Sequence, residues 1–244
     1  MIPARYAATR FPGKLMQKLG NKSVILRTYE ATVATGLFDT IIVVTDSDLI
    51  FKEINSQGGT AIMSKKVHES GTDRIAEAAI DIACDIIVNV QGDEPFVKKE
   101  PLQKLLQQFD DTTVEVASLM QELKSEKQVM DPDYVKVAID KNKNSLFFSR
   151  SVIPYRREKN ISIPYYEHIG VYAFRKQALL SFANWPVSQL EAAEKIECLR
   201  FLENGMSIRM VLTDYMGVEI DTPEDLKRAE RFLQIPSVLP SEEN

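Results

Sequence analysis

The sequence has few of the residues that build covalent scaffolds or histidine metal sites. Its 244 residues include two cysteines, two histidines and one tryptophan. Cys84 and Cys198 lie far apart without a Cys-X-X-Cys spacing, so they indicate neither a disulfide framework nor a zinc site. Two histidines exclude a histidine-rich metal site, and no Ser-His-Asp order stands out. We therefore expect two reduced thiols.

Long apolar runs are also absent. No run approaches the roughly 20 residues that span a bilayer, and the N-terminus lacks the charged-then-apolar pattern of a signal peptide. The net charge of −5 argues against general nucleic-acid binding, which normally requires a basic face. We expect a soluble cytoplasmic protein that binds neither nucleic acid nor membrane.

Short β-branched runs alternate with helical stretches along most of the chain. The expected strands include 40–46, 59–63, 85–94, 114–119 and 135–139. Continuous apolar runs such as 41–44 suit strands that are covered on both faces. The pattern therefore predicts an α/β protein, a three-layer α/β/α sandwich with a mostly parallel central sheet.

Two helix starts are marked by capping residues. Ser23 can cap a helix over 23–35, in which apolar side chains recur near helical spacing. A second helix begins in "DTPEDL", where Asp221 or Thr222 stands at the cap and Pro223 at the first helical position.

The pattern favours one domain over residues 1–234, followed by a C-terminal tail over 235–244. Within the domain, the segment 149–166 contains two prolines and three tyrosines beside a charged run. This segment reads as part of an excursion from the sheet around 145–200, serving dimerisation or sugar binding. A substrate lid and a solvated loop are the alternatives.

The first 29 residues contain six Lys or Arg and no Asp or Glu, although the whole chain is acidic. If residues 2–4 end a first strand, residues 5–14 leave the carboxyl edge of the sheet, where open α/β sheets bind ligands. Arg5, Arg10 and Lys14 can then converge on phosphate oxygens. The stretch matches neither GxxxxGK[ST] nor GxGxxG, which disfavours a P-loop NTPase or a dinucleotide-binding dehydrogenase. Ordinary surface charge remains the alternative.

Two aspartates are candidate metal ligands. "VNVQGDEPF" places Asp93 directly after an apolar strand, and Asp221 is the second candidate. Mg²⁺ prefers oxygen ligands and usually binds one or two carboxylates plus phosphate. The alternative for Asp221 is a helix N-cap. A basic loop with two aspartates points to a metal-bound nucleoside triphosphate and to phosphoryl or nucleotidyl transfer.

Several ordered motifs resemble one family, the 3-deoxy-manno-octulosonate (Kdo) cytidylyltransferases, also called CMP-Kdo synthetases. The resemblance covers about 2–232 and is carried by "IPARYAATRFPGK", "HESGTDR", "NVQGDEPF", "FSRSVIP", "HIGVYAFR", "EKIECLR" and "DTPEDL". It implies a nucleotidyltransferase-type fold, a homodimer and Mg²⁺ as cofactor. It also implies that CTP and Kdo give CMP-Kdo and pyrophosphate, for lipopolysaccharide biosynthesis.

The resemblance also assigns roles to residues. It implies nucleotide contacts at Ala4, Arg5, Arg10, Lys14, Ser70, Gly71 and Arg74, and metal ligands at Asp93 and Asp221. Its sugar contacts would be Gln91, Arg150, His168, Tyr172 and Glu197, and its catalytic residues Arg5, Lys14, Asp93 and Asp221.

Without the resemblance, most of these residues have plainer interpretations. "SGT" can be a turn that caps the next helix, and Arg150 a surface ion pair. His168 can be a satisfied residue at a strand edge, Tyr172 a core residue and Glu197 part of a solvated helix face.

The sequence departs from the family pattern at several positions. The first strand is expected to be short, "GKLM" stands where "GKPL" is usual, and "AAT" stands where "AST" is common. Cys198 replaces a frequent Gln, which removes an amide donor from the expected sugar site.

Three alternative functions stay open. One is a cytidylyltransferase for another eight- or nine-carbon keto acid, such as a sialic acid. Another is a nucleotide-binding protein without catalytic activity, and the third is an α/β domain whose charges only decorate its surface.

Overall fold

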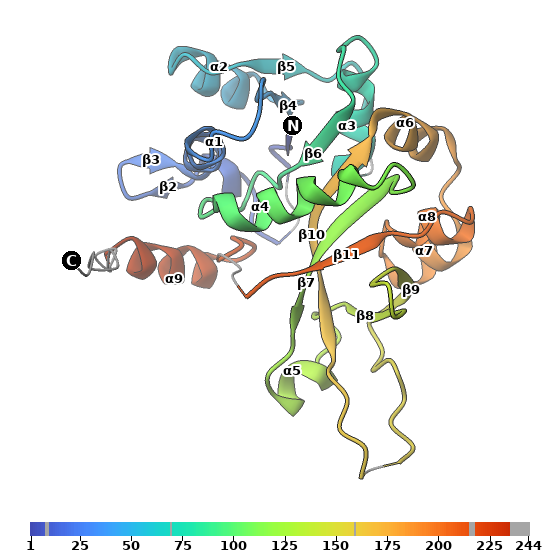
Figure 1. The fold of residues 1–244 in the computed structure, drawn as a ribbon. Helices are drawn as coiled ribbons and strands as arrows, with labels where there is room; N and C mark the ends of the chain where they lie inside the picture. Colours follow the sequence, from blue (N-terminus) through green and yellow to red (C-terminus); the bar gives the residue numbers. More distant parts are fainter. Residues whose placement is uncertain (8–9, 69, 159, 215–217, 235–244) are drawn as a thin grey trace, which may run out of the picture.

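The protein is described here by a computed structural model that covers residues 1–7, 10–68, 70–158, 160–214 and 218–234 (Figure 1). A three-stranded parallel sheet is formed by β1 (Ile2–Ala4), β4 (Val43–Thr45) and β5 (Ala61–Met63). A second sheet contains β6 (Ile86–Asn89), β7 (Val116–Glu122), β8 (Lys136–Ile139), β9 (Ser145–Ser149), β10 (Tyr166–Arg175) and β11 (Arg209–Leu212). The two sheets meet where the Val90 N–H donates to the Met1 carbonyl at 3.1 Å.

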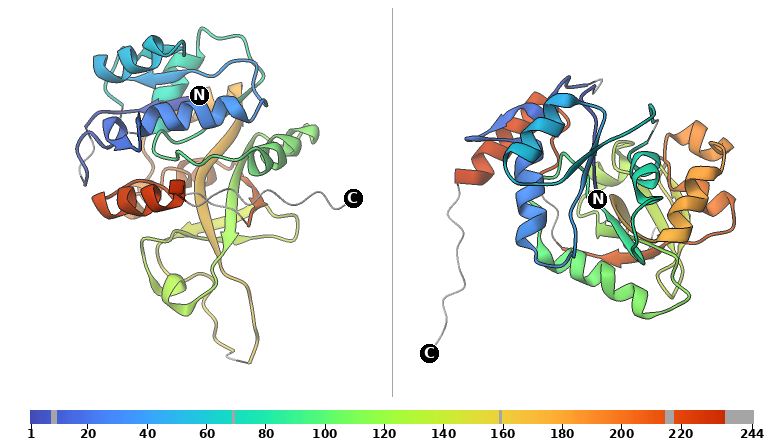
Figure 2. Two further views of the ribbon diagram at one scale, coloured as in Figure 1. Left: turned by 90° about the vertical axis from the view of Figure 1, so that its left-hand side faces the viewer. Right: turned by 90° about the horizontal axis from the view of Figure 1, so that it is seen from above.

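The longer helices cover both faces of these sheets (Figure 2). They are α1 (Val24–Ala34), α2 (Asp48–Ser56), α3 (Gly71–Ala79), α4 (Lys99–Leu106), α6 (Lys176–Asn184) and α9 (Pro223–Gln234). Shorter elements are η1 (Lys14–Met16), β2 (Lys18–Leu19), β3 (Lys22–Ser23), η2 (Gln107–Asp110), α5 (Glu126–Met130), α7 (Gln189–Glu194) and α8 (Leu199–Glu203). The expected helix over 23–35 is α1, and the Ser23 side chain accepts from the Leu26 N–H as its cap.

Alternate strand residues enter two separate hydrophobic cores. Val43 packs in the core beneath α1, α2, α4 and α9, whereas its neighbour Val44 packs in the core beneath α3, α6 and α8. The same division separates Ala173 from Phe174 in β10. Because successive strand residues point to opposite faces, this division confirms the predicted three-layer α/β/α arrangement.

Parallel pairing is confined to part of the structure. Strands β1, β4 and β5 are parallel to one another, as are β7 and β11. The long strand β10 instead runs antiparallel to β6, β7 and β8. Strand direction could not be predicted from these apolar runs, because a strand buried on both faces has the same composition in either direction.

The chain between β9 and β10 leaves the sheet, as the prolines at 154 and 164 predicted, and extends as a long arm below β8 and α5 (Figure 1). Along this arm, Tyr155 is 86% exposed and Ile161 is 54% exposed. Its expected role in dimerisation or sugar binding stays a prediction. The expected tail over 235–244 lies outside the described residues.

Within the described part of the chain, no helix combines the length and the hydrophobicity needed to cross a membrane.

Candidate functional site

Strands β1 and β6 end side by side and lead into the two motifs that contain the candidate ligands. A cavity of about 260 Å³ lies at this edge. It is lined by Pro3, Arg5, Arg10, Lys14, Leu15, His68, Ser70, Gly71, Arg74, Gln91, Gly92, Asp93, Glu219 and Asp221. Nine of the sequence-predicted site residues are among them, so the tertiary structure gathers the basic loop, "SGTDR", "QGD" and "DTPED" around one space.

Gly92 allows the two strand ends to approach each other. A Cβ atom at this position would lie 2.9 Å from the Pro3 carbonyl oxygen and 3.2 Å from Ile25. The backbone oxygen cannot move away without disturbing β1, so only glycine fits without strain. This close approach sets Asp93 beside the loop that follows β1.

Lys14 connects the two predicted metal ligands. Its ammonium donates a hydrogen bond to Asp221 at 2.7 Å and another to Asp93. Arg10 donates to the second oxygen of Asp221 at 2.6 Å. Partial burial by itself lowers the pKa of Lys14, but the Asp93 and Asp221 carboxylates outweigh it and raise the pKa above the ordinary value. Lys14 is therefore a firmly held cation between two carboxylates.

Asp221 does not cap the last helix. The Thr222 hydroxyl accepts from the Asp225 N–H at 3.2 Å, and the Asp225 carboxylate accepts from the Thr222 N–H at 2.9 Å. This reciprocal pattern is that of a capping box with Thr222 as the N-cap. The capping interpretation of Asp221 is thus wrong, and its carboxylate is available to the cavity.

Glu219 is a candidate ligand that the sequence reasoning missed. One carboxylate oxygen each from Asp93, Glu219 and Asp221 lie within 4.8 Å of one another. Loss of solvent around its carboxylate, together with repulsion from Asp93 and Asp221, raises the pKa of Glu219 to about 8. The signal was the order Glu219-Ile220-Asp221, because the fully buried Ile220 turns its two neighbours to the same side.

These three carboxylates fit a divalent cation chemically. They supply only oxygen atoms, which Mg²⁺ prefers, and they surround a position where Lys14 already places a positive charge. The donor set therefore suits a hard cation that is shared with phosphate oxygens.

The "SGTDR" motif forms the start of α3 on another side of the cavity. Ser70 is the N-cap, since its hydroxyl oxygen accepts from the Asp73 N–H at 3.0 Å. Gly71 lies against Pro3, where an added Cβ would be 3.0 Å from the proline ring. Arg74 is only 3% exposed, and its guanidinium donates to Asp46 at 2.8 Å and to Ser64 at 2.7 Å. The helix-capping interpretation is correct for Ser70, which nevertheless lines the cavity.

Ala4 and Arg5 differ in exposure although they are neighbours. Ala4 ends β1 and is buried, so its side chain packs in the core and does not line the cavity. Arg5 is exposed and lines the cavity.

Gln91 connects the cavity to β10, which contains two of the predicted sugar contacts. Its amide donates to the Gly170 carbonyl at 3.0 Å. Tyr172 pairs in register with Asn89 of β6, and the His168 and Tyr172 rings are 5.3 Å apart. The Nε2 of His168 and the Oδ1 of Asn89 are buried without a hydrogen-bond partner among the described residues. These two atoms mark unsatisfied polar positions next to Tyr172.

Burial governs the protonation of these residues. It lowers the pKa of His168 to about 4 and raises that of Tyr172 well above the usual value. The Tyr172 hydroxyl hydrogen-bonds to Cys198, whose thiol pKa is also raised by burial. His168 is therefore neutral near pH 7, and Cys198 is a buried, unreactive thiol.

Glu197 lies between α7 and α8 and accepts from the Thr72 hydroxyl at 2.8 Å. Glu197 is half-buried in a turn, so the interpretation of this residue as part of a solvated helix face is wrong, and its burial raises the pKa of its carboxyl. Arg150 does not contact these residues. Its guanidinium donates hydrogen bonds to the backbone carbonyls of Glu194 and Pro132. The structure does not bring Arg150, His168, Tyr172 or Glu197 to the lining of the cavity.

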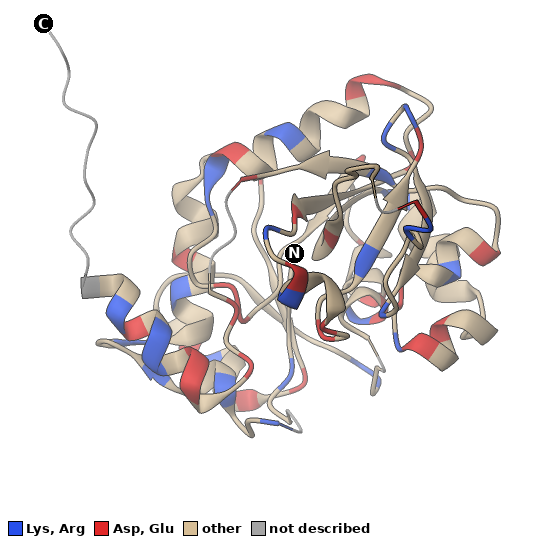
Figure 3. Cartoon of the chain, turned by 90° about the horizontal axis from the view of Figure 1, so that it is seen from below, with Lys and Arg blue, Asp and Glu red and all other residues tan. Residues whose placement is uncertain are grey.

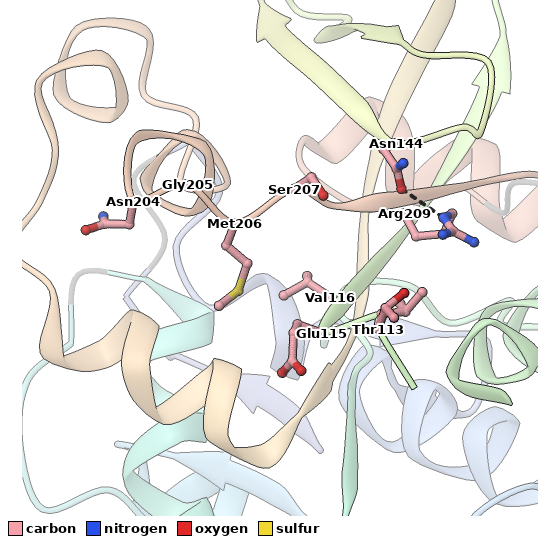
Figure 4. A pocket seen from close by; sticks show the side chains of 10 residues that line it. Thr113, Glu115, Val116, Asn144, Asn204, Gly205, Met206, Ser207 and Arg209 are labelled. Atoms are coloured by element: carbon pink, nitrogen blue, oxygen red, sulfur yellow. Dashed lines mark hydrogen bonds between the residues drawn. The ribbon is translucent and has the colours of Figure 1, made fainter. Parts of the chain in front are cut away.

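The described residues form a second cavity whose lining differs from that of this site. Figure 3 shows that Lys and Arg positions are interspersed with Asp and Glu positions along the ribbon. The second cavity, of about 400 Å³, lies at the start of β7 and beside β11, where Arg209 donates to Asn144 at 2.9 Å (Figure 4). It shares no lining residue with the first cavity and contains no cluster of carboxylates.

Comparison with known proteins identifies the family of the chain. The cytidylyltransferase family model matches residues 1–208. The 3-deoxy-manno-octulosonate cytidylyltransferase of Flavobacterium johnsoniae is 58% identical over 237 residues, covering 96% of this chain and 97% of the relative. The protein of the same name from Christiangramia forsetii is 54% identical over 236 residues, with 96% and 95% coverage.

A solved structure extends the match to three dimensions. It is CMP:2-keto-3-deoxy-manno-octonic acid synthetase complexed with CTP, which superposes with a TM-score of 0.91 at 35% identity over 96% of both chains. Sequence identity at this level over nearly the whole length, with the same fold, leaves one assignment. The chain belongs to the 3-deoxy-manno-octulosonate cytidylyltransferase family.

Proposed function

We propose that this protein transfers the cytidylyl group of CTP to 3-deoxy-manno-octulosonate (Kdo), giving CMP-Kdo and pyrophosphate for lipopolysaccharide biosynthesis. The observation that carries the proposal is the cavity in which Lys14, Asp93 and Asp221 meet Ser70 and Gly71. It combines cations for phosphate oxygens, carboxylates for a metal and a helix start for a nucleotide.

The reaction breaks a phosphoanhydride bond of CTP and forms a phosphoester bond to the sugar. The anomeric hydroxyl oxygen of Kdo attacks the α-phosphorus of CTP, and the bond from that phosphorus to the bridging oxygen of the β-phosphate breaks. Pyrophosphate leaves with the bond electrons, and the hydroxyl proton passes to solvent. The protein's task is to hold both substrates in line and to stabilise charge on the leaving group.

Basic side chains would bind the triphosphate. Arg5, Arg10 and Lys14 line one side of the cavity, and each can donate charge-assisted hydrogen bonds to phosphate oxygens. Ser70 and Gly71, with Arg74 held in place by Asp46, would contact the nucleoside. Ala4 would contribute through its backbone at the end of β1, because its side chain is buried.

Asp93 and Asp221 would hold Mg²⁺, and Glu219 is close enough to assist. A bound Mg²⁺ supplies charge neutralisation on the phosphate oxygens of CTP and on the departing pyrophosphate. Arg10 and Lys14 would maintain the positions of the carboxylates and of the phosphates around it.

The sugar acid would lie beyond Gln91, toward β10. Unsatisfied polar atoms on His168 and Asn89, with the Tyr172 hydroxyl and Glu197 nearby, offer partners for the many hydroxyls of Kdo. Arg150 can pair bidentately with the Kdo carboxylate if the arm between β9 and β10 brings it closer. We also propose a homodimer that acts in the cytoplasm, where CTP is available.

The decisive experiment measures pyrophosphate release from CTP and Mg²⁺ with and without Kdo, with EDTA and the other nucleoside triphosphates as controls. Release that requires CTP, Kdo and metal together is the expected result. Turnover with sialic acid in place of Kdo would instead select the related keto-acid cytidylyltransferases. CTP binding without any pyrophosphate release would identify a catalytically inactive relative.

A further inference from the structure

Arg200 on α8 is buried within a group of ionic contacts that the proposed chemistry does not use. Its side chain is 3% exposed. The guanidinium donates to both carboxylate oxygens of Glu191, at 2.7 and 2.6 Å, and stacks over the Phe182 ring at 4.0 Å. Glu191 is also buried. Breaking such a pair by removing one partner is strongly destabilising, so this part of the contact network fixes Arg200 in one orientation.

From that orientation, Arg200 reaches the start of α3. Its remaining terminal nitrogen donates to one carboxylate oxygen of Asp73 at 3.3 Å. The other oxygen of Asp73 accepts from the Ser70 hydroxyl at 2.7 Å. Each oxygen of Asp73 therefore has a different partner, and the carboxylate connects Arg200 to Ser70.

Ser70 in turn determines how α3 begins. It is the N-cap of α3, and together with Gly71 it lines the cavity. An ordered hydroxyl and an ordered first turn present fixed hydrogen-bond groups to a ligand, which reduces the entropy lost on binding. Thr72 reinforces the same junction, since its hydroxyl donates to Glu197, three residues before Arg200.

We propose that Arg200 is a positioning residue that acts through Asp73 to hold Ser70 and Gly71 in the geometry that binds CTP. By fixing α8 against α3, it also joins the cavity to the segment that contains Glu197. This inference rests on the proposed use of the cavity as a CTP site.

The first test replaces Asp73, because that substitution leaves the buried Arg200–Glu191 pair intact. In Asp73→Asn, an amide nitrogen takes the place of one acceptor oxygen. Arg200 then loses its charged partner, and the Ser70 hydroxyl must turn from donating to accepting if both contacts are to persist. We expect the dissociation constant for CTP, measured by isothermal titration calorimetry with Mg²⁺, to rise about tenfold, equivalent to about 1.4 kcal/mol. The melting temperature is expected to change little, since Arg200 keeps both bonds to Glu191 and Ser70 keeps its cap bond to the residue 73 N–H.

Asp111→Asn is the matched control. Asp111 also pairs with an arginine, Arg209 at 3.5 Å, and also accepts from a neighbouring hydroxyl, that of Thr113 at 2.6 Å. Its two partners, Thr113 and Arg209, line the second cavity (Figure 4), which shares no lining residue with the carboxylate site. The same chemical change there is expected to leave the CTP dissociation constant unchanged.

Two further variants test the connection itself. Asp73→Glu keeps the negative charge at a position where Glu commonly completes a capping box, and it is expected to recover most of the CTP affinity. Arg200→Lys cannot donate to Glu191 and Asp73 in one plane. It is expected to weaken CTP binding, and adding Asp73→Asn to it should weaken CTP binding little further.

Wild-type CTP affinity in Asp73→Asn, or an equal loss in Asp111→Asn, would overturn the inference. So would fully additive losses in the double variant. Pyrophosphate release with Kdo is measured separately on the unaltered protein. Its absence would refute the proposed reaction while the CTP affinities still decide the role of Arg200.

Discussion

The Lys14 ammonium lies 2.7 Å from the Asp221 carboxylate, although 207 positions separate the two residues in the sequence. The same ammonium donates a hydrogen bond to Asp93. One lysine therefore joins the loop that follows β6 to the segment that precedes α9. A positive charge thus stands among carboxylates that suit a divalent cation.

Lys14→Met is expected to separate metal binding from catalysis. Removing the ammonium leaves Asp93, Asp221 and Glu219 without their nearest cation, so Mn²⁺ should bind more tightly than to the unaltered protein when CTP is absent. Pyrophosphate release should nevertheless fall by about 100-fold or more, because a phosphate-stabilising donor is lost. Titration calorimetry with Mn²⁺ measures the first effect, and weaker Mn²⁺ binding would contradict it.

Asp93→Asn is expected to reduce turnover by about 100-fold or more and to preserve the fold, since it removes charge without changing side-chain size. The assay is pyrophosphate release across a range of Mg²⁺ concentrations, accompanied by a thermal melt. EDTA should abolish release by the unaltered protein. Unaltered activity at limiting Mg²⁺ would remove Asp93 from the metal site.

Thr222 and Asp221 should have separable effects, because only Thr222 caps α9. Thr222→Ala is expected to lower the free energy of unfolding by about 1 kcal/mol and to retain turnover. Asp221→Asn is expected to retain stability and to lose turnover. Urea unfolding and the pyrophosphate assay on both variants test this, and a reversed pattern would restore the capping role of Asp221.

His168 should make stability depend on pH. Burial holds its folded-state pKa at about 4, below the ordinary value of 6.5, so the unfolded chain binds more protons between these values. Its contribution is complete above about pH 6.5 and is lost as the pH falls toward 4. The loss is on the order of 3 kcal/mol at most.

The matching experiment compares urea unfolding of the unaltered protein and His168→Gln at pH 7.5 and pH 4.5. The unaltered protein should lose more stability on acidification than the variant does. Equal losses would show that His168 does not remain neutral in the folded state.

The exposed arm should contribute to self-association. Tyr155 and Ile161 are large apolar residues on a segment that extends away from the sheet. Light scattering after size exclusion at low micromolar concentration is expected to give twice the chain mass. Tyr155→Ser with Ile161→Ser should shift the population toward the monomer, and a 27.6 kDa species alone in the unaltered protein would exclude the dimer.

Local sequence patterns were sufficient for most secondary-structure elements. Ser23 marked the start of α1, and Pro223 with its acidic neighbours marked the start of α9. The apolar runs predicted the positions of β4, β5, β6, β7 and β8, although the strands themselves are shorter or displaced by a few residues. These features depend on neighbours within a few positions, which is why composition and periodicity reveal them.

Other features depended on contacts that no local pattern contains. The antiparallel course of β10 and the pairing of Arg74 with Asp46 follow from packing between distant segments. Glu219 lies at the site because its neighbour Ile220 is buried in the core. Arg150 does not line the cavity, because its guanidinium is bonded to the backbone carbonyls of Glu194 and Pro132.

By itself, the sequence determined the α/β class, the order of the elements and the chemical character of the ligand, because charge, periodicity and motif order are properties of the chain. Only the tertiary structure decided which carboxylates share a cation and how Arg200 reaches Ser70 through Asp73. Such contacts join residues far apart in sequence, and their geometry is fixed by the packing of helices on a sheet.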